Sequence, residues 1–202
     1  EARLYAENAE RAFLPATGRL ALVDLPEEAA RVDAGVRTGD VVTPFYDPMI
    51  AKLIVHGRDR DAALARLADA LGRCRIAGCV TNVGFLHALA ALPAFAAGDV
   101  DTGLIERELP ALTRAPAPSG PVVAVAALAS LDLLDPPDGA DPWTALQGWR
   151  AWGVAERGVD LVWRGTLVTA TVGVRAPGRF DVVTDGGGET IALAGRRGPA
   201  VR

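Results

Sequence analysis

Few side chains in this sequence are spaced so that their types alone suggest chemistry. Neither His56 nor His87 stands beside a motif that would tune it for acid–base catalysis. Cys74 and Cys79 have only His87 near them in the sequence, which is too few ligands for a zinc site. We therefore interpret the histidines as ordinary strand-end and helix-face residues, and the cysteines as small, buried, reduced thiols.

Two other segments could carry chemistry. Asp185-Gly186-Gly187-Gly188 has the glycines of a phosphate loop, but it lacks both the Lys-Ser/Thr pair and the following helix that such a loop needs. We therefore predict a hairpin turn there. Arg3, within Glu1-Ala2-Arg3-Leu4-Tyr5, is by spacing alone an exposed strand arginine that pairs with Glu1 or Glu7.

The elements around these residues predict an α+β unit over residues 1–112. Alternating or β-branched apolar residues predict strands at 18–25, 31–36, 40–43 and 49–56. Asp59 is placed to cap a helix that runs to about Cys74, and Thr81 to cap a second helix that Pro93 stops. A last helix, 103–109, is expected to end before Pro110.

A proline-rich segment, 113–121, predicts a semi-stiff linker to a second domain, 122–202, which we expect to be truncated. The second domain begins with a short apolar helix at 122–134. Turn signals then separate strands expected at 159–163, 166–174, 180–184 and 190–193. Sequential strands with short turns favour an antiparallel meander, and we expect it to curl into a small β-barrel around the helix.

Charge and hydropathy exclude several classes of partner. The 202 residues carry a net charge of −4, which argues against nucleic acid or an anionic membrane as the main partner. The longest apolar run, 122–134, is too short to span a bilayer. With two reduced thiols, these features predict a cytoplasmic or mitochondrial-matrix protein, of which cytoplasmic is our prediction. The first residue is Glu, so we expect a piece of a longer protein.

A series of motifs in chain order gives the sequence a family resemblance. They are Glu1-Ala2-Arg3-Leu4-Tyr5, Phe13-Leu14-Pro15-Ala16-Thr17-Gly18, Val32-Asp33-Ala34-Gly35-Val36, Phe45-Tyr46-Asp47-Pro48-Met49-Ile50-Ala51-Lys52-Leu53, Cys79-Val80-Thr81-Asn82-Val83, Pro93-Ala94-Phe95 and Gly98-Asp99-Val100-Asp101-Thr102. Together they resemble the C-terminal domain of biotin carboxylase, and most closely that of the biotin-carrying α subunits of acyl-CoA carboxylases.

The second domain resembles the region that follows biotin carboxylase in α subunits of the 3-methylcrotonyl-CoA, geranyl-CoA and propionyl-CoA type. Asp141-Pro142-Trp143, Leu146 and Gly148-Trp149-Arg150 carry this likeness, together with the meander. The resemblance implies a domain that docks a carboxyltransferase β subunit.

The resemblance also implies an activity, that of a ligase which carboxylates biotin with ATP and bicarbonate. In that chemistry an arginine at the position of Arg3 stabilises the biotin enolate, because negative charge grows on the ureido oxygen in the transition state. The cofactors implied are ATP with Mg²⁺ or Mn²⁺, and biotin on a carrier domain. Neither the nucleotide and metal residues nor the Ala-Met-Lys-Met biotin motif is present, so we expect this chain alone to be inactive, with no cofactor or metal site of its own.

The resemblance makes Arg31 and Asp47 candidates for a carboxylase dimer interface. For Asp47 a simpler alternative remains, that of a turn former beside Pro48.

Two alternatives to the whole interpretation also remain. The chain is then either a non-catalytic docking module with an incidental Arg3, or part of another biotin-dependent carboxylase such as pyruvate or urea carboxylase. The sequence does not determine which acyl-CoA is carboxylated.

Overall fold

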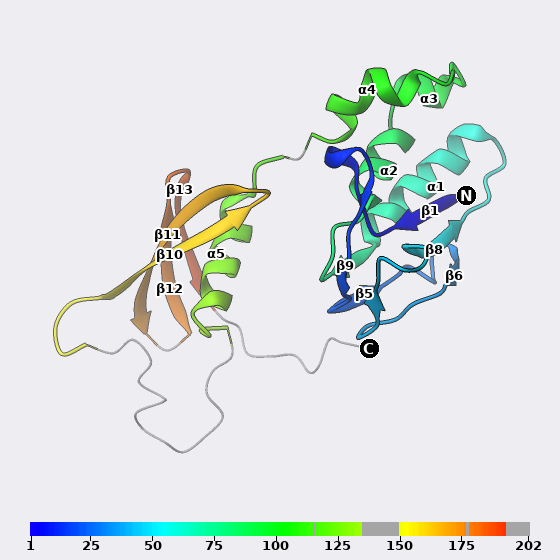
Figure 1. The fold of residues 1–202 in the computed structure, drawn as a ribbon. Helices are drawn as coiled ribbons and strands as arrows, with labels where there is room; N and C mark the ends of the chain where they lie inside the picture. Colours follow the sequence, from blue (N-terminus) through cyan, green and yellow to red (C-terminus); the bar gives the residue numbers. More distant parts are fainter. Residues whose placement is uncertain (115, 135–149, 177, 193–202) are drawn as a thin grey trace. The chain divides into compact units, whose positions relative to one another are not determined.

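The computed structural model describes residues 1–114, 116–134, 150–176 and 178–192. The chain divides into two compact units, Glu1–Ala115 and Pro116–Arg202, each considered by itself (Figure 1). The elements of the first unit are β1 Ala2–Tyr5, β2 Glu7–Asn8, the 3-10 turn η1 Ala9–Arg11, β3 Leu14–Pro15, β4 Gly18–Arg19, β5 Leu22–Asp24, β6 Arg31–Ala34, β7 Val41–Val42, β8 Met49–Ile54, α1 Arg60–Arg73, β9 Arg75–Ala77, α2 Val83–Ala90, α3 Pro93–Ala97 and α4 Leu104–Leu112.

A three-stranded antiparallel sheet forms the centre of the first unit. Its strand order is β1-β8-β6, so β8 lies in the middle, as its apolar sequence predicted. Leu4, Ile50 and Leu53 are fully buried in its core, and Leu71 of α1 joins them. Three two-stranded pairs, β2-β3, β4-β7 and β5-β9, complete the strands of this unit. The α+β class predicted from the sequence is therefore confirmed.

The first helix follows its sequence signals closely. The Asp59 side chain accepts a hydrogen bond of 2.8 Å from the Ala62 amide, which satisfies one of the free donors at the start of α1. The helix ends at Arg73, and the buried residues Ala70 and Leu71 turn its apolar side toward the sheet. The predicted cap and end of this helix are thus confirmed.

Two helix boundaries differ from the predictions. The second helix begins at Val83 with Asn82 as its N-cap residue, so the expectation that Thr81 caps it is wrong. Helix α4 continues to Leu112 through Pro110, whereas the sequence predicted an end before this proline. Burial explains the continuation, because Leu112 and Leu109 pack against Phe85 and its neighbours, and this packing offsets the hydrogen bond that proline cannot donate.

The second unit is a helix packed on an antiparallel meander. Its elements are α5 Gly120–Ser130, β10 Ala155–Trp163, β11 Thr166–Ala176, β12 Arg179–Thr184 and β13 Gly187–Ala192. The sheet order is β10-β11-β12-β13, and α5 contacts all four strands (Figure 1). Leu128, Val172 and Val182 are fully buried between helix and sheet. The predicted meander around a helix is present; among the described residues β10 and β13 are the open edges of the sheet.

Three details of the second unit bear on the sequence predictions. Helix α5 starts at Gly120, with Pro121 in its first turn, so its start overlaps the end of the segment predicted as a linker. The turn after Thr184 joins β12 to β13 as a hairpin, which confirms the reading of the glycine run as a turn. The segment Asp141-Pro142-Trp143, with Leu146, Gly148 and Trp149, lies outside the described residues.

Close backbone approach makes Gly78 irreplaceable. It has φ +109°, and a Cβ there would lie 1.9 Å from the Arg19 carbonyl oxygen. We expect Gly78→Ala to lower the free energy of unfolding of the first unit by about 3 kcal/mol, as backbone strain and steric overlap combine. Circular dichroism during urea unfolding measures this loss.

Gly98 offers a matched control, because it has φ +80° but open space around its Cβ position. Gly98→Ala should cost only about 1 kcal/mol. All four tryptophans follow residue 142, so their fluorescence reports the second unit and should not change in either variant. Equal losses for the two substitutions would contradict the role of the Arg19 contact.

The segment between α4 and α5 should be the first site of proteolysis. Arg114 is exposed and lies next to the end of the first unit, outside any helix or strand. We expect limited trypsin digestion to cut after Arg114 before any site within α1, such as Arg66, because helix backbone must unfold to enter a protease. Mass spectrometry of early time points identifies the cut. Earlier cleavage inside 60–92 would show that the domain boundary is misplaced.

Candidate active site

Strand β1 points Arg3 away from the core. Its neighbours Ala2 and Leu4 are 6% and 0% exposed, whereas the Arg3 side chain is 62% exposed. Successive strand residues face opposite sides of a sheet, so burying Ala2 and Leu4 forces Arg3 to the solvent side. Arg3 is thus held on a short, well-buried strand while its guanidinium remains accessible.

Arg3 pairs with a carboxylate beside it on the chain. Its Nε lies 3.2 Å from Glu1 Oε1, which decides between the two partners that the sequence allowed. The hydrogen bond to Glu1 raises the pKa of Arg3, and Tyr5 adds to the rise. Lys52 stands opposite Arg3 on β8, with its Nζ 3.6 Å from Asp33 Oδ2. Because the Arg3–Glu1 pair is exposed, it contributes little to stability, and the cation is free to exchange partners.

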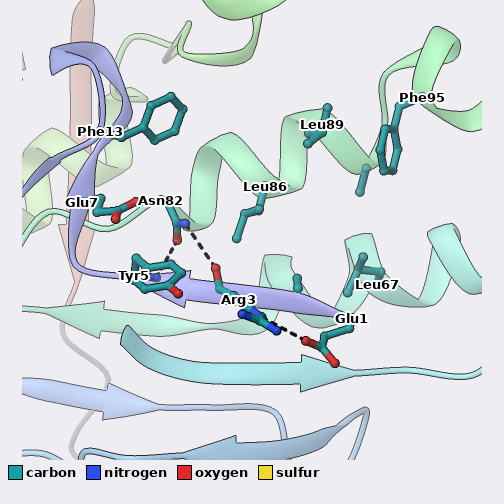
Figure 2. Close-up of a pocket in the computed structure, with 12 residues that line it drawn as sticks. Glu1, Arg3, Tyr5, Glu7, Phe13, Leu67, Asn82, Leu86, Leu89 and Phe95 are labelled. Carbon is teal, nitrogen blue, oxygen red and sulfur yellow. Dashed lines mark hydrogen bonds and ion pairs between the residues drawn. The ribbon is translucent and has the colours of Figure 1, made fainter. Parts of the chain in front are cut away.

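A depression of about 320 Å³ opens beside Arg3 (Figure 2). One side is polar and consists of Glu1, Arg3, Tyr5 and Glu7 from the first strands. The other side is mainly apolar and is built by helices α1, α2 and α3, with Phe13 from the loop after η1. The residues on this second side are Phe13, Leu67, Asn82, Leu86, Leu89, Ala90 and Phe95. Arg3 is therefore one of the polar residues that line a largely apolar recess, where a polar group on an apolar ligand could meet its cation.

Asn82 connects the two sides of this depression. It is the only buried polar side chain among the described residues, at 5% exposed. Its Oδ1 accepts a hydrogen bond of 2.9 Å from the Tyr5 amide, and its Nδ2 donates one of 3.2 Å to the Arg3 carbonyl (Figure 2). The sequence presented Asn82 only as part of a Thr-Asn motif, and no local signal pointed to these distant partners.

The loop that carries Phe13 closes one end of the depression. Ala12 and Phe13 both have positive φ, 51° and 58°, which is uncommon for residues with a Cβ. The Phe13 ring compensates by packing edge-on against Phe85, with centroids 5.0 Å apart.

Partial burial raises the pKa of Glu7 at the rim, and the charge of Asp47 adds to the rise.

The structure does not bring the other candidate residues into this site. Arg31 lies on β6, where it pairs with Asp33 at 3.1 Å and is 73% exposed. Asp47 accepts a hydrogen bond of 3.0 Å from the Met49 amide, as a turn former does. Their part in a dimer interface stays a prediction. Within the described ranges no group of three or more His, Cys, Asp or Glu side chains is arranged to hold a metal ion.

The cysteines and histidines occupy structural positions. The Cys74 thiol donates to the Ala70 carbonyl within α1, and Cys79 lies beside the main core. Both cysteines are half-buried, so the prediction of fully buried thiols is wrong. His56 follows β8, and its carbonyl accepts a hydrogen bond from Arg66; His87 lies in α2. In the part of the chain that the structure describes, no helix is long and apolar enough to cross a membrane.

Comparison with known proteins assigns the first unit. Residues 1–107 match the family described as the biotin carboxylase C-terminal domain, which is more than half of the chain. The chain therefore belongs to the biotin carboxylase C-terminal domain family, a family of carboxylase enzymes, and the resemblance drawn from its motifs is confirmed.

Two curated relatives show which biotin-dependent carboxylases the chain is similar to. The α subunit of mitochondrial methylcrotonoyl-CoA carboxylase from Dictyostelium discoideum is 42% identical over 158 residues, covering 74% of this chain and 23% of the relative. Urea amidolyase from Saccharomyces cerevisiae is 44% identical over 105 residues, covering 52% of this chain and 6% of the relative. The chain thus spans less than a quarter of the length of either relative.

A solved structure supports the fold. The biotin carboxylase domain dimer of Hydrogenobacter thermophilus 2-oxoglutarate carboxylase, in complex with MgADP, ADP and bicarbonate, is 28% identical. The match covers 57% of this chain and 26% of the solved chain, with a TM-score of 0.55.

Partial burial should make Cys74 slow to react. Desolvation raises the pKa of its thiol to about 11, and nearby Asp24 adds to the rise. At pH 8 only about one thiol in a thousand is then ionised, so alkylation by iodoacetamide should be on the order of a hundredfold slower than for a free cysteine. The rate should rise about tenfold per pH unit while the fold persists.

Trypsin cleaves after Arg75, so peptide mapping can follow Cys74 and Cys79 separately. Urea-unfolded protein is the control, since both thiols should then react at the rate of a free cysteine. Fast labelling of Cys74 in the folded chain at pH 8 would contradict a half-buried, structural thiol.

Proposed function

We propose that this chain is part of the biotin carboxylase component of an acyl-CoA carboxylase of the methylcrotonoyl-CoA type. The complete protein would use ATP and bicarbonate to carboxylate biotin held on a carrier domain. The observation that carries the proposal is the position of Arg3. A permanently charged guanidinium projects from a family-matched strand to the rim of a recess, where a ligand can reach it.

The role proposed for Arg3 follows from charge development. Removing the ureido proton of biotin places negative charge on the ureido oxygen, and this charge is larger in the transition state than in the ground state. A fixed cation at that oxygen therefore stabilises the transition state selectively. Arginine suits the role because it keeps its proton and presents planar donors. Because the ion pair with Glu1 is exposed and weak, the guanidinium can leave it to contact a ligand at a small cost in free energy.

The described residues of this chain do not fit the other implied groups. They include no metal-binding cluster, and Lys52, the only lysine of the sequence, sits in β8 paired with Asp33 rather than in a biotin-attachment motif. Nucleotide, metal and covalent biotin would therefore be held elsewhere in the complete protein. We accordingly propose that the chain alone is inactive.

The extent of one relative supports the acyl-CoA carboxylase over a urea carboxylase. The methylcrotonoyl-CoA carboxylase match covers 158 residues, more than the 115 of the first unit, so it reaches into the second unit. The urea amidolyase match covers only 105 residues. A urea or pyruvate carboxylase origin remains the second candidate, because the first unit matches several biotin-dependent carboxylases.

The second unit supplies the proposed partner contact. We propose that residues 122–202 dock a carboxyltransferase β subunit, while 1–112 face the biotin carrier domain. Exposed apolar side chains on the second unit, such as Trp152 at 74% and Val162 at 73%, support a docking role. The proposed compartment is the cytoplasm, and the mitochondrial names of several relatives make the matrix the alternative.

In the complete polypeptide, Arg3→Ala should lower kcat for biotin carboxylation by about 10²–10³, as expected for the loss of one donor to a developing oxyanion. KM for ATP should stay within about twofold, because no nucleotide-binding residue is proposed in this chain. Arg3→Lys should recover little, since a point charge does not reproduce a planar fork. Steady-state carboxylation of biotin with an ATP titration measures all three.

Arg75→Ala is the matched control, because Arg75 is also an exposed strand arginine paired with a carboxylate, Asp24, at 3.7 Å. It should leave kcat unchanged. Near-normal carboxylation by Arg3→Ala would show that Arg3 is structural and would remove the main support for the proposed function.

A further inference from the structure

Among the described residues, strand β1 has a neighbouring strand on one edge only. The sheet order β1-β8-β6 places β8 on one side of β1 only. An edge strand leaves backbone donors and acceptors that must find other partners when they are buried. Here Asn82 supplies three of these partners, at the Arg3 carbonyl, the Tyr5 amide and the Tyr5 carbonyl, the last through its own backbone amide at 3.1 Å.

These bonds fall where the other side of β1 is irregular. Arg3 pairs with Lys52 and Leu4 with Ala51, but Tyr5 pairs with Met49, so the register with β8 shifts between Leu4 and Tyr5. A shift of this kind bends the strand and weakens the ladder locally. The hydrogen bonds from Asn82 to residues 3 and 5 therefore fix the β1 backbone on both sides of the register shift, where pairing with β8 is disturbed.

The Asn82 side chain is committed to β1 rather than to its own helix. Asparagine at an N-cap commonly accepts a hydrogen bond from the next turn, yet the Asn82 side chain makes no such bond to α2. Its amide instead offers a donor and an acceptor on one plane, as a peptide group of an adjacent strand would. Neither aspartate nor leucine can supply both.

We propose that Asn82 is a positioning residue for Arg3. It takes the place of a neighbouring strand at the free edge of β1 and holds the Arg3 backbone so that Arg3 lines the depression. This inference rests on the proposed role of Arg3 in biotin carboxylation, and Asn82 itself touches no reacting atom. A displacement of about 1 Å in a catalytic group can cost on the order of a hundredfold in rate, so the effect is measurable.

The kinetic test is a double-mutant cycle in the complete polypeptide. Asn82→Ala should lower kcat for biotin carboxylation roughly tenfold to a hundredfold and leave KM for ATP within about twofold. In an Arg3→Ala background the same substitution should change kcat less than about twofold, because the residue it positions is gone. Asn82→Asp, which keeps the acceptor for Tyr5 but loses the donor to Arg3, should give an intermediate kcat.

Thr38→Ala is the matched control. The Thr38 hydroxyl likewise bridges a strand backbone, accepting from the Val23 amide at 2.8 Å and donating to the Val23 carbonyl, but it lies outside the depression. It should leave kcat unchanged. Independent, multiplying effects of Asn82→Ala and Arg3→Ala would overturn the proposal, as would a normal kcat for Asn82→Ala when Arg3→Ala is strongly impaired. A normal kcat for Arg3→Ala would instead overturn the proposed function, and the positioning role with it.

A second measurement on the 202-residue chain tests the geometry without catalysis. The Tyr5 amide donates to Asn82 Oδ1, so its hydrogen exchange should become roughly tenfold faster in Asn82→Ala. Amides of the second unit, such as Val172 in β11, serve as the internal reference and should not change. An unchanged Tyr5 amide in Asn82→Ala would show that Asn82 does not hold β1 and would overturn the proposal whatever the kinetics.

Discussion

The pairing of β1 with β8 is the interaction on which the candidate site depends. Four residue pairs join the two strands, and Leu4, Ile50 and Leu53 are buried completely around them. Burying each such side chain is worth about 1.5–3 kcal/mol, far more than the exposed ion pair between Arg3 and Glu1. The apolar side of β1 therefore decides the position of Arg3, and the charged partners adjust to it.

The same core also builds the wall opposite Arg3. Helix α1 packs Ala70 and Leu71 against the sheet, and Leu67, one turn earlier, reaches the depression. Helix α2 contributes Leu86 both to this core and to the recess. A cation on a strand and an apolar wall on two helices are thus positioned by one set of buried contacts, which is an economical way to keep a site rigid.

In the second unit, the packing of the apolar helix α5 on the sheet holds the structure together. A helix with apolar side chains all round, such as α5, needs cover on most of its surface. The meander covers one side of α5, because the helix contacts all four strands and its Ala124, Ala127 and Leu128 are fully buried, while Val122 and Val125 stay exposed. The side chains on the other face of the sheet do not contribute to this core, and several of them are exposed and apolar.

The sequence by itself determined the local features: the α+β class, the central strand β8, the cap at Asp59, the hairpin after Thr184 and the family motifs around Arg3. These follow from periodicity and from turn and cap residues, which act over a few positions. Tertiary structure alone decided that Glu1 is the partner of Arg3, that α4 passes through Pro110 and that Asn82 holds β1. The last contact joins residues 79 positions apart. It exists because β1 is an edge strand whose outer backbone groups need partners other than a strand, a property of the assembled sheet that no local pattern encodes.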